Sequence, residues 1–368
     1  MWYACVSCGT DRSYASTVEE APVARFAKER RVDFDKAIDL EAIRRSGGVV
    51  EENAVASILA IGDGVYCVEF RSKMNAMDRD VLAMLERGVR RAETHGAGVV
   101  VANEGRVFSA GANLALIASD IEARAFDRIE QLLLAFQRSF TAVKYAAVPV
   151  VAAPRVKALG GGCELCLHAH ALIAHADTSM GLVELSVGLL PAGGGTKEMA
   201  LKAIRLADEY RADVTPFLVR GFDLIVTARA SRSADELRDM GFLRHGDSVV
   251  PDAATLIRNA KLRVLALSDG HRAGSPALDL KAPGRNATAV LAARLHDLRL
   301  GGYITEYDEV VGTRVAQVMA GGDVPAGTLV TEEHYLALER EAFLSLCGEP
   351  RTLQRIRHVL ATGERLRN

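Results

Sequence analysis

The chain has 368 residues, 49% of them hydrophobic and 25% charged, and its 45 basic residues nearly balance 47 acidic ones. The net charge of −2 argues against the dense basic surface of a nucleic-acid-binding protein. The longest apolar runs fall short of the roughly 18–20 residues that a membrane span needs. Residues 1–10 lack the basic and apolar regions of a signal peptide. Six cysteines are too few for a disulfide framework, so we expect a soluble protein of the reducing cytoplasm.

The regular pattern of the chain begins near residue 54. Residues 1–53 are polar and irregular, and we expect an N-terminal extension there, with a weak helix over residues 34–43. Residues 57–61 predict a strand and residues 65–70 its partner. Gly62, Asp63 and Gly64 between them predict a hairpin turn.

Two helices are predicted downstream of this hairpin. Asp78 is suited to an N-cap, and apolar side chains on one face predict a helix that ends near His95, before Gly96. Residues 126–143 carry apolar side chains three and four positions apart, which also indicates a helix. A coiled-coil seam needs a longer repeat than this segment offers. We therefore interpret it as a helix that packs on the core.

Short apolar runs and glycine-rich loops alternate through the middle of the chain. Residues 98–102, 148–153 and 172–176 predict buried strands, and glycine loops lie at 160–162 and 193–195. Alternation of strands with helices is typical of an α/β fold.

The pattern changes again beyond residue 230, where strand-like runs nearly vanish. Helices are predicted from Thr331 to Gly348 and from Thr352 to near Gly363, each opened by a capping residue. We therefore expect a helical C-terminal region over residues 231–368.

Two Cys-x-x-Cys pairs, Cys5/Cys8 and Cys163/Cys166, raise the question of a metal site. The pairs lie much further apart than the roughly 15–20 residues of a zinc ribbon. Cys163 and Cys166 also have helical spacing in an apolar stretch, where buried thiols are common. We expect no metal ion.

Two loops rich in small residues are candidates for binding a ligand through their backbone. Residues 108–114 follow a predicted buried strand, and residues 159–164 lie between a strand and a helix. Glycines at a helix N-terminus leave N–H donors unpaired, and the helix dipole favours negative charge there. The amides of Ala112 and Gly161 could converge on one oxygen as an oxyanion hole.

Two glutamates accompany these loops and are candidates for an acid/base pair. Glu164 lies at the start of the predicted helix after Gly161. Glu184 follows an apolar run at residues 180–183. A single glutamate at a helix start is usually a surface residue favoured by the dipole, and one after a strand is usually solvated. Spacing alone leaves both interpretations open.

At these residues the sequence resembles the crotonase, or enoyl-CoA hydratase/isomerase, superfamily. The matching strings occur in the order and spacing of the family and cover about residues 54–230. They are KMNAMD at 73–78, FSAGANL at 108–114, ALGGGCEL at 158–165 and MGLVELSVGLLPAGGGT at 180–196. The resemblance implies a crotonase-type spiral of β-β-α turns over residues 54–230, followed by the helical region, which packs against the core or mediates oligomerisation.

The chain is most similar to the C-terminal hydratase portion of bacterial fused 3-hydroxyacyl-CoA dehydrogenase/enoyl-CoA hydratases. The strings SAGANL, PAGGGTKEM and LEREAFLSLCGEPRT carry this narrower resemblance. It implies that residues 1–53 are a junction and that the dehydrogenase half would lie upstream. It further implies a homo-oligomer and a dehydrogenase or thiolase partner in fatty-acid β-oxidation.

The resemblance also implies roles for individual residues. The amides of Ala112 and Gly161 would hold the thioester oxygen, with Glu164 as base and Glu184 as acid in the syn hydration of a trans-2-enoyl-CoA. The roles of the two glutamates could be reversed. No metal or redox cofactor is implied, because the CoA thioester is itself the substrate. The substrate-binding residues would be Lys73, Asn75, Ala76, Ala110, Gly111, Pro191, Ala192 and Gly193.

Three points stay open at the level of sequence. Asn113 and Ala192 depart from the residues common in the family, and Ala192 puts the substrate preference in doubt. An enoyl-CoA isomerase would need only one carboxylate. A non-catalytic module that docks a dehydrogenase is the alternative outside enzymes.

The basic residues Arg71, Lys73 and Arg79 are candidates for contact with the anionic end of CoA.

Overall fold

The computed structural model describes residues 37–368. The Cys5/Cys8 pair and the first part of the predicted helix at 34–43 lie outside them. Within the described part this helix begins later, at Leu40, because the Asp39 side chain accepts the N–H of Ala42 and caps it there.

The described residues form an α/β structure in which helices predominate after residue 250. The strands are β1 (Val49–Glu52), β2 (Ala56–Ala60), β3 (Val65–Phe70), β4 (Gly98–Val101), β5 (Val150–Ala152), β6 (Lys157–Leu159), β7 (Ala171–His175), β8 (Ser179–Gly181), β9 (Ser248–Val250), β10 (Leu280–Lys281) and β11 (Leu329–Val330). The α-helices are α1 (Leu40–Arg45), α2 (Arg79–His95), α3 (Leu114–Glu122), α4 (Phe126–Lys144), α5 (Gly161–His168), α6 (Gly195–Tyr210), α7 (Thr215–Val226), α8 (Ala234–Met240), α9 (Leu256–Ser268), α10 (Gly284–Leu300), α11 (Glu306–Met319), α12 (Glu332–Cys347) and α13 (Pro350–Thr362). Short 3₁₀ turns are η1 (Lys73–Asn75), η2 (Glu184–Val187) and η3 (Ala253–Thr255).

The main sheet has the strand order β1-β2-β3-β4-β5-β7-β9. Strands β1 to β3 are antiparallel, and the pairs from β3 onward are parallel. The predicted hairpin is confirmed, because Gly62, Asp63 and Gly64 all take positive φ between β2 and β3. The apolar strands β4 and β5 are fully buried, as parallel strands covered on both faces are.

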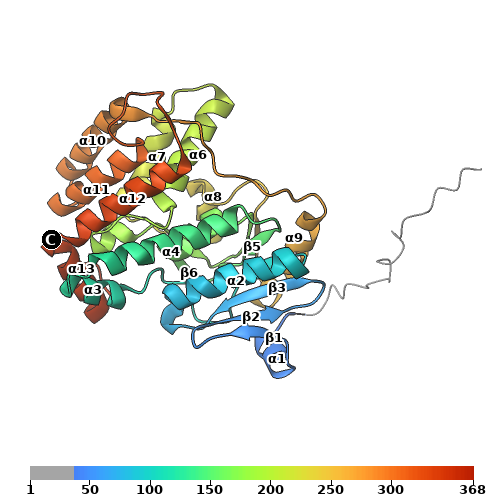
Figure 1. The fold of residues 1–368 in the computed structure, drawn as a ribbon. Helices are drawn as coiled ribbons and strands as arrows, with labels where there is room; N and C mark the ends of the chain where they lie inside the picture. The colour runs from blue at the N-terminus through green and yellow to red at the C-terminus, as the bar shows by residue number, and fades with distance from the viewer. Residues whose placement is uncertain (1–36) are drawn as a thin grey trace, which may run out of the picture. The chain divides into compact units, whose positions relative to one another are not determined.

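Helices cover both faces of this sheet, and alternate strand residues point to opposite sides. Val68 and Val99 face the cluster that includes α2, whereas Cys67 and Val100 face the cluster that includes α9. Figure 1 shows α2 and α4 running side by side on one face of the sheet. Asp78 caps α2 with its side chain, so the predicted start of that helix is confirmed.

Two elements of the predicted helical region are in contact with the main sheet, one as an edge strand and one as a covering helix. Strand β9 pairs with β7 at its edge, and α9 covers the face opposite α2. Strand β9 has only three residues, too few for the alternating pattern of a strand to be recognised in the sequence. The sequence analysis therefore missed it. The domain limits at residues 53/54 and 230/231 stay predictions.

A second, two-stranded parallel sheet of β6 and β8 carries the loops of interest. Leu159 is opposite Gly181 in its register, and an isolated bridge joins Ser109 to Ala158. The loop at 108–114, the glycine loop after β6 and the turn after β8 therefore meet at one place.

The C-terminal helices pack against the core. Helices α11 and α12 contact α6, α12 also contacts α4, and α13 contacts α3 and η2. The predicted helix after Thr331 is confirmed with both of its limits. The start predicted at Thr352 is wrong, because α13 begins at Pro350, whose fixed φ suits the first helical turn.

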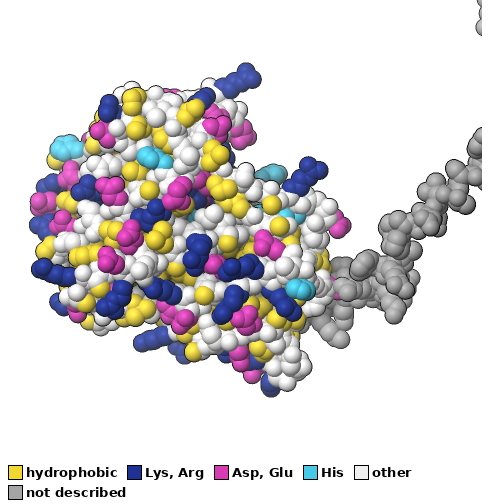
Figure 2. All heavy atoms as spheres, viewed as in Figure 1, with side chains coloured by type: hydrophobic (Ala, Val, Ile, Leu, Met, Phe, Trp, Pro, Cys, Tyr) yellow, Lys and Arg dark blue, Asp and Glu magenta, His cyan; other side chains and the backbone are white. Residues whose placement is uncertain are grey.

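The surface agrees with the composition. Lys and Arg side chains lie among Asp and Glu side chains on the face shown in Figure 2, as the near-zero net charge predicts. Within residues 37–368 none of the helices combines the length and the apolar character needed to cross a bilayer.

Candidate active site

The loop at residues 108–114 is held in place by buried polar side chains. Asn103 Nδ2 donates to the Phe108 carbonyl, and Asn75 Nδ2 donates to the Val107 carbonyl. Ser109 Oγ in turn donates to the Asn75 carbonyl at 2.8 Å. Asn75, predicted to bind substrate, is thus buried and supports the loop.

The two glycine-containing loops touch through their backbones. Gly111 has φ +95° and Gly160 has φ +55°, a region that favours glycine. A Cβ at Gly111 would lie 2.9 Å from the Leu159 carbonyl oxygen and 3.1 Å from the Gly161 nitrogen. A side chain at Gly111 would therefore force the loops apart.

This contact places the amides of Ala112 and Gly161 next to each other. A Cβ at Gly161 would lie 3.6 Å from the Ala112 nitrogen. Gly161 is the first residue of α5, where a helix leaves its N–H groups unpaired. Neither N–H donates to an acceptor in the part of the chain that the structure describes. Both residues line the same cavity. The two amides are therefore adjacent and unpaired, and their role as an oxyanion hole stays a prediction.

Glu164 is buried, with 4% of its surface exposed. Its Oε1 accepts the N–H groups of Gly193 and Gly195, each at 2.8 Å, from the amino end of α6. Burial raises the pKa of Glu164 to about 7, although these hydrogen bonds and the charge of Lys197 act in the opposite direction. Glu164 can therefore exchange a proton near neutral pH.

Glu184 opens the short turn η2 rather than ending a longer strand, because β8 stops at Gly181. Its Oε2 atom is buried and has no hydrogen-bond partner within residues 37–368. Burial first, and the charge of Glu164 second, raise the pKa of Glu184 well above its usual range. Both effects favour the protonated form of the Glu184 carboxyl.

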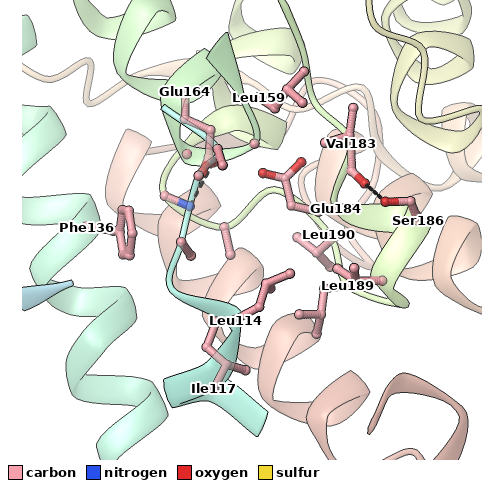
Figure 3. Close-up of a pocket in the computed structure, with 18 of the residues that line it drawn as sticks. Leu114, Ile117, Phe136, Leu159, Glu164, Val183, Glu184, Ser186, Leu189 and Leu190 are labelled. Atoms are coloured by element: carbon pink, nitrogen blue, oxygen red, sulfur yellow. Dashed lines mark hydrogen bonds between the residues drawn. The ribbon is translucent and has the colours of Figure 1, made fainter. Parts of the chain in front are cut away.

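The two carboxyl groups face a common cavity of about 370 Å³. Figure 3 shows Glu164 and Glu184 turned toward one another, with Leu114, Ile117, Leu189 and Leu190 below them. The amides of Ala112 and Gly161 line the same cavity. Two buried carboxyls, two free amides and an apolar wall are thus combined in one place.

The C-terminal helices complete the wall of this cavity. Phe343 comes from α12, Val359 lies in α13, and Gly363 ends α13. Sequence reasoning missed all three, because no motif marks them. Val359 and Gly363 line the same cavity as Ala112 and Gly161, which lie more than half the chain away from them in sequence. Met74 and Lys157 also line the cavity and were not predicted.

The predicted substrate-binding residues divide into two groups. Ala110, Gly111, Ala192 and Gly193 line the cavity, whereas Lys73, Asn75, Ala76 and Pro191 lie outside the set of described residues that line it. The Pro191 carbonyl accepts the hydroxyl of Thr196 at 2.7 Å and so shapes the loop before α6. The Ala192 carbonyl accepts Gln137 Nε2 at 2.8 Å.

The predicted basic residues are engaged to different degrees. Arg71 donates to the Asn53 carbonyl, and Arg79 donates to the Arg128 carbonyl. Lys73 is exposed, next to the cavity-lining residue Met74. Lys157, at the cavity itself, is exposed as well.

The second Cys-x-x-Cys pair lies within the described residues. Cys163 and Cys166 are free and fully buried in the core. Across residues 37–368 there is no group of three His, Cys, Asp or Glu side chains placed to hold a metal ion.

Comparison with known proteins agrees with this arrangement. Residues 60–207 match the family model described as enoyl-CoA hydratase/isomerase. The fold resembles the crystal structure of an enoyl-CoA hydratase from Bacillus halodurans, with a TM-score of 0.55 at 14% identity over 83% of this chain and 100% of that one. An enoyl-CoA hydratase from Mycobacterium avium subsp. paratuberculosis K-10 gives a TM-score of 0.52 at 17% identity over 83% of this chain and 98% of that one. The expected fold is confirmed, and the chain contains a crotonase-family domain.

Longer relatives match almost the whole chain. A probable 3-hydroxyacyl-CoA dehydrogenase of Bacillus subtilis is 38% identical over 344 residues, which are 94% of this chain and 43% of that protein. A putative fatty acid oxidation complex trifunctional enzyme of Rickettsia felis is 27% identical over 90% of this chain and 42% of that protein. The chain thus spans about two fifths of the length of these relatives and resembles enzymes of fatty acid oxidation.

Proposed function

We propose that this chain is an enoyl-CoA hydratase, which adds water reversibly across the double bond of a trans-2-enoyl-CoA to form a 3-hydroxyacyl-CoA. The observation that carries the proposal is the pair of buried carboxyls, Glu164 and Glu184, on the cavity that also holds two unpaired amides. An isomerase needs one carboxylate to move a proton, whereas syn hydration uses one group for each end of the double bond.

The protonation states support one assignment of roles. Glu164, with a pKa of about 7, is available as the base that takes a proton from water as its oxygen attacks the β-carbon. Glu184, whose pKa is raised far above its usual range, holds the proton that passes to the α-carbon. After one hydration Glu164 carries an extra proton and Glu184 has lost one, so Glu164 releases its proton to solvent and Glu184 takes one up before the next turnover. Dehydration runs the same two transfers in reverse, with Glu184 as base and Glu164 as acid.

The amides of Ala112 and Gly161 would stabilise the oxygen of the thioester. Negative charge develops on this oxygen when water adds to the β-carbon, because the intermediate is an enolate. Two preorganised N–H donors stabilise such a charge more than they stabilise the neutral carbonyl, which lowers the barrier. The reaction so written needs no metal or redox cofactor, since the thioester makes the α-carbon acidic.

The remaining cavity supports an acyl-CoA as the substrate class. Its apolar part, with Leu132, Leu133 and Phe343, would accept the acyl chain. Lys157 and Lys73 would attract the phosphates of CoA. The names of the longer relatives support a place for this reaction in fatty acid oxidation. From the sequence resemblance we further propose that the chain acts in the cytoplasm, in a homo-oligomer with a dehydrogenase or thiolase partner.

Glutamine variants test the proposal, because glutamine keeps the shape of glutamate but does not transfer the proton. Glu164→Gln and Glu184→Gln should each lower the hydration of crotonyl-CoA by about 10²–10⁴-fold, the range for general acid–base catalysis. Loss of the enoyl-thioester absorbance measures the rate, and product analysis separates the 3-hydroxyacyl-CoA from a shifted alkene. Glu341→Gln, an exposed position on α12, is the control.

The outcomes separate the candidate functions. If either variant keeps a near-wild-type hydration rate, that glutamate is not catalytic and the two-glutamate mechanism is wrong. If the wild-type protein shifts the double bond and forms no 3-hydroxyacyl-CoA, the isomerase replaces the hydratase. If the wild-type protein binds acyl-CoA but catalyses neither reaction, the chain is a docking module.

A further inference from the structure

The turn that carries Glu184 is held by helix α13 from the C-terminal region. Arg355 Nη1 donates to the Leu185 carbonyl at 3.0 Å. Thr352 Oγ1 donates to the Gly188 carbonyl at 2.9 Å. The two hydrogen bonds therefore hold η2 at Leu185, its second residue, and at Gly188, the residue that caps its end.

Arg355 is itself fixed in orientation. Its side chain is fully buried, and Nη1 also donates to Asp308 Oδ1 at 2.6 Å. Asp308 accepts the N–H of Thr305 as part of the capping box of α11. The guanidinium lies over the Tyr307 ring, with Cζ 4.9 Å from the centroid. The donor that reaches Leu185 therefore has little freedom to move.

Thr352 fits against the turn without spare room. Gly188 has φ +79°, and a Cβ there would lie 2.9 Å from Thr352 Oγ1 and 3.1 Å from Tyr307 Cε1. The Tyr307 hydroxyl lies 2.6 Å from Thr352 Oγ1. Since Thr352 donates to Gly188, Tyr307 donates to Thr352. A chain of hydrogen bonds thus runs from α11 through α13 to η2.

Glu184 depends on this support more than Glu164 does. Glu164 is fixed through its own carboxyl, which accepts two N–H groups from the start of α6. The buried Oε2 of Glu184 has no such partner within residues 37–368. The place of the Glu184 carboxyl is therefore set by the backbone of η2.

We propose that Arg355 and Thr352 are positioning residues for Glu184, so that α13 completes the active site by holding the acid in place. The inference rests on the function proposed above. A misplacement of about 1 Å can cost about 10²-fold in rate. Loosening η2 should therefore lower kcat more than it changes KM for acyl-CoA, because most of the residues that line the cavity lie outside η2.

Conservative variants test this role without removing the buried charge. Thr352→Val keeps the shape but loses the hydroxyl, and Thr352→Ser keeps the hydroxyl. Arg355→Lys keeps the positive charge beside Asp308, but its shorter, flexible side chain lacks the fixed planar group through which Nη1 reaches both Asp308 and Leu185. Arg357→Lys is the matched control, because Arg357 lies on the same helix and is exposed, in an ion pair with Glu122.

We expect Thr352→Val and Arg355→Lys to lower kcat for crotonyl-CoA hydration by about tenfold or more, with KM within about twofold, as for a small misplacement of a catalytic group. Exchange of the α-hydrogen of the product with solvent deuterium should fall in parallel. Thr352→Ser and Arg357→Lys should keep kcat close to wild type. Thermal unfolding of each variant is measured as a control, to check that the assay temperature lies below its Tm.

A purely structural role predicts a different result. If Thr352→Val and Arg355→Lys lower Tm but leave kcat and exchange unchanged, the inference is overturned. Equal losses of kcat in Thr352→Ser and Thr352→Val would also overturn it. Glu184→Gln in the same assay separates this failure from that of the proposed function. A slow Glu184→Gln beside fast Thr352→Val and Arg355→Lys contradicts only the positioning role, whereas a fast Glu184→Gln contradicts the proposed function of Glu184 as the acid.

Discussion

Glu164 and Glu339 accept hydrogen bonds from the same end of one helix. Glu164 Oε1, from α5, binds the N–H groups of Gly193 and Gly195, and Glu339 Oε1, from α12, binds the N–H of Lys197 at 2.6 Å. Both side chains are buried. Burial first, and the charge of Glu164 second, raise the pKa of Glu339 well above its usual range. Burial beside Glu164 therefore favours the protonated form of Glu339, which caps the same helix.

Substitutions of Glu339 should separate its shape from its charge. Glu339→Gln keeps an acceptor for Lys197 and is neutral like the protonated glutamate, so we expect wild-type kcat and an unchanged pH profile. Glu339→Ala leaves the Lys197 N–H without an acceptor and should cost about 1–3 kcal/mol of stability. Hydration assays and chemical denaturation check both. A shift of the pH profile in Glu339→Gln would show that Glu339 carries charge.

The stability of the protein should depend on pH through Glu164. Burial raises the pKa of Glu164 from 4.5 to about 7, so the folded state keeps a proton that the unfolded chain has lost between these values. Stability therefore falls as pH rises through this window. Glu164→Gln does not titrate, so its Tm relative to wild type should increase between pH 5 and pH 8. A difference that is constant with pH would contradict the raised pKa.

The hydration rate should follow a bell-shaped pH profile. If Glu164 is the base, kcat/KM should rise about tenfold per pH unit below a pKa of about 7, because only its ionised form accepts the proton. At higher pH the rate should fall when Glu184 loses its proton. Initial rates with crotonyl-CoA from pH 5 to pH 10 measure this profile. A flat acid limb would mean that Glu164 is not the base.

Neighbouring glycines should respond differently to alanine. A Cβ at Gly161 would meet only the edge of Phe136, at 3.1 Å, and would lie close to the Ala112 amide. We expect Gly161→Ala to lower kcat about tenfold or more by disturbing the two-amide site, with a small loss of Tm. A Cβ at Gly162 would lie 2.8 Å from Ser109 Cβ, so Gly162→Ala should lower Tm instead. Equal effects of the two on Tm would argue against the oxyanion site.

The lysines near the cavity should act on binding rather than on chemistry. Lys157 lines the cavity and Lys73 is adjacent to Met74, which also lines it. Replacing either by alanine should raise KM for acyl-CoA several-fold at unchanged kcat, the pattern of lost uniform binding. Arg71→Ala serves for comparison, because Arg71 is held by the Asn53 carbonyl and should affect stability more than KM. An unchanged KM in both lysine variants would place the CoA phosphates elsewhere.

Local features of the fold were predictable where neighbours in sequence are the interacting partners. The cap of Asp78 on α2, the turn at Gly62 to Gly64 and the apolar face of α4 all involve residues a few positions apart. The glycine loops were also predictable. Gly111 and Gly160 have positive φ values, which residues other than glycine rarely adopt, so the glycines themselves mark these loops in the sequence. Glu164 and Glu184 were found by their place beside these loops.

The tertiary structure decided which of these pieces form a site and what completes it. The burial that raises the pKa of Glu164 and Glu184 depends on elements from the whole described chain, so spacing left their roles open. The bond from Arg355 to the Leu185 carbonyl joins residues 170 positions apart, and β9 joins the sheet beside β7 with only three residues. Contacts of this kind leave no periodic signal, because each depends on how helices and strands pack and not on the order of neighbouring side chains. The sequence by itself determined the local elements, the glycine turns and the candidate acid/base groups. Only packing determined the burial of these groups, their proton affinity and the contacts of α13 with the turn that carries Glu184.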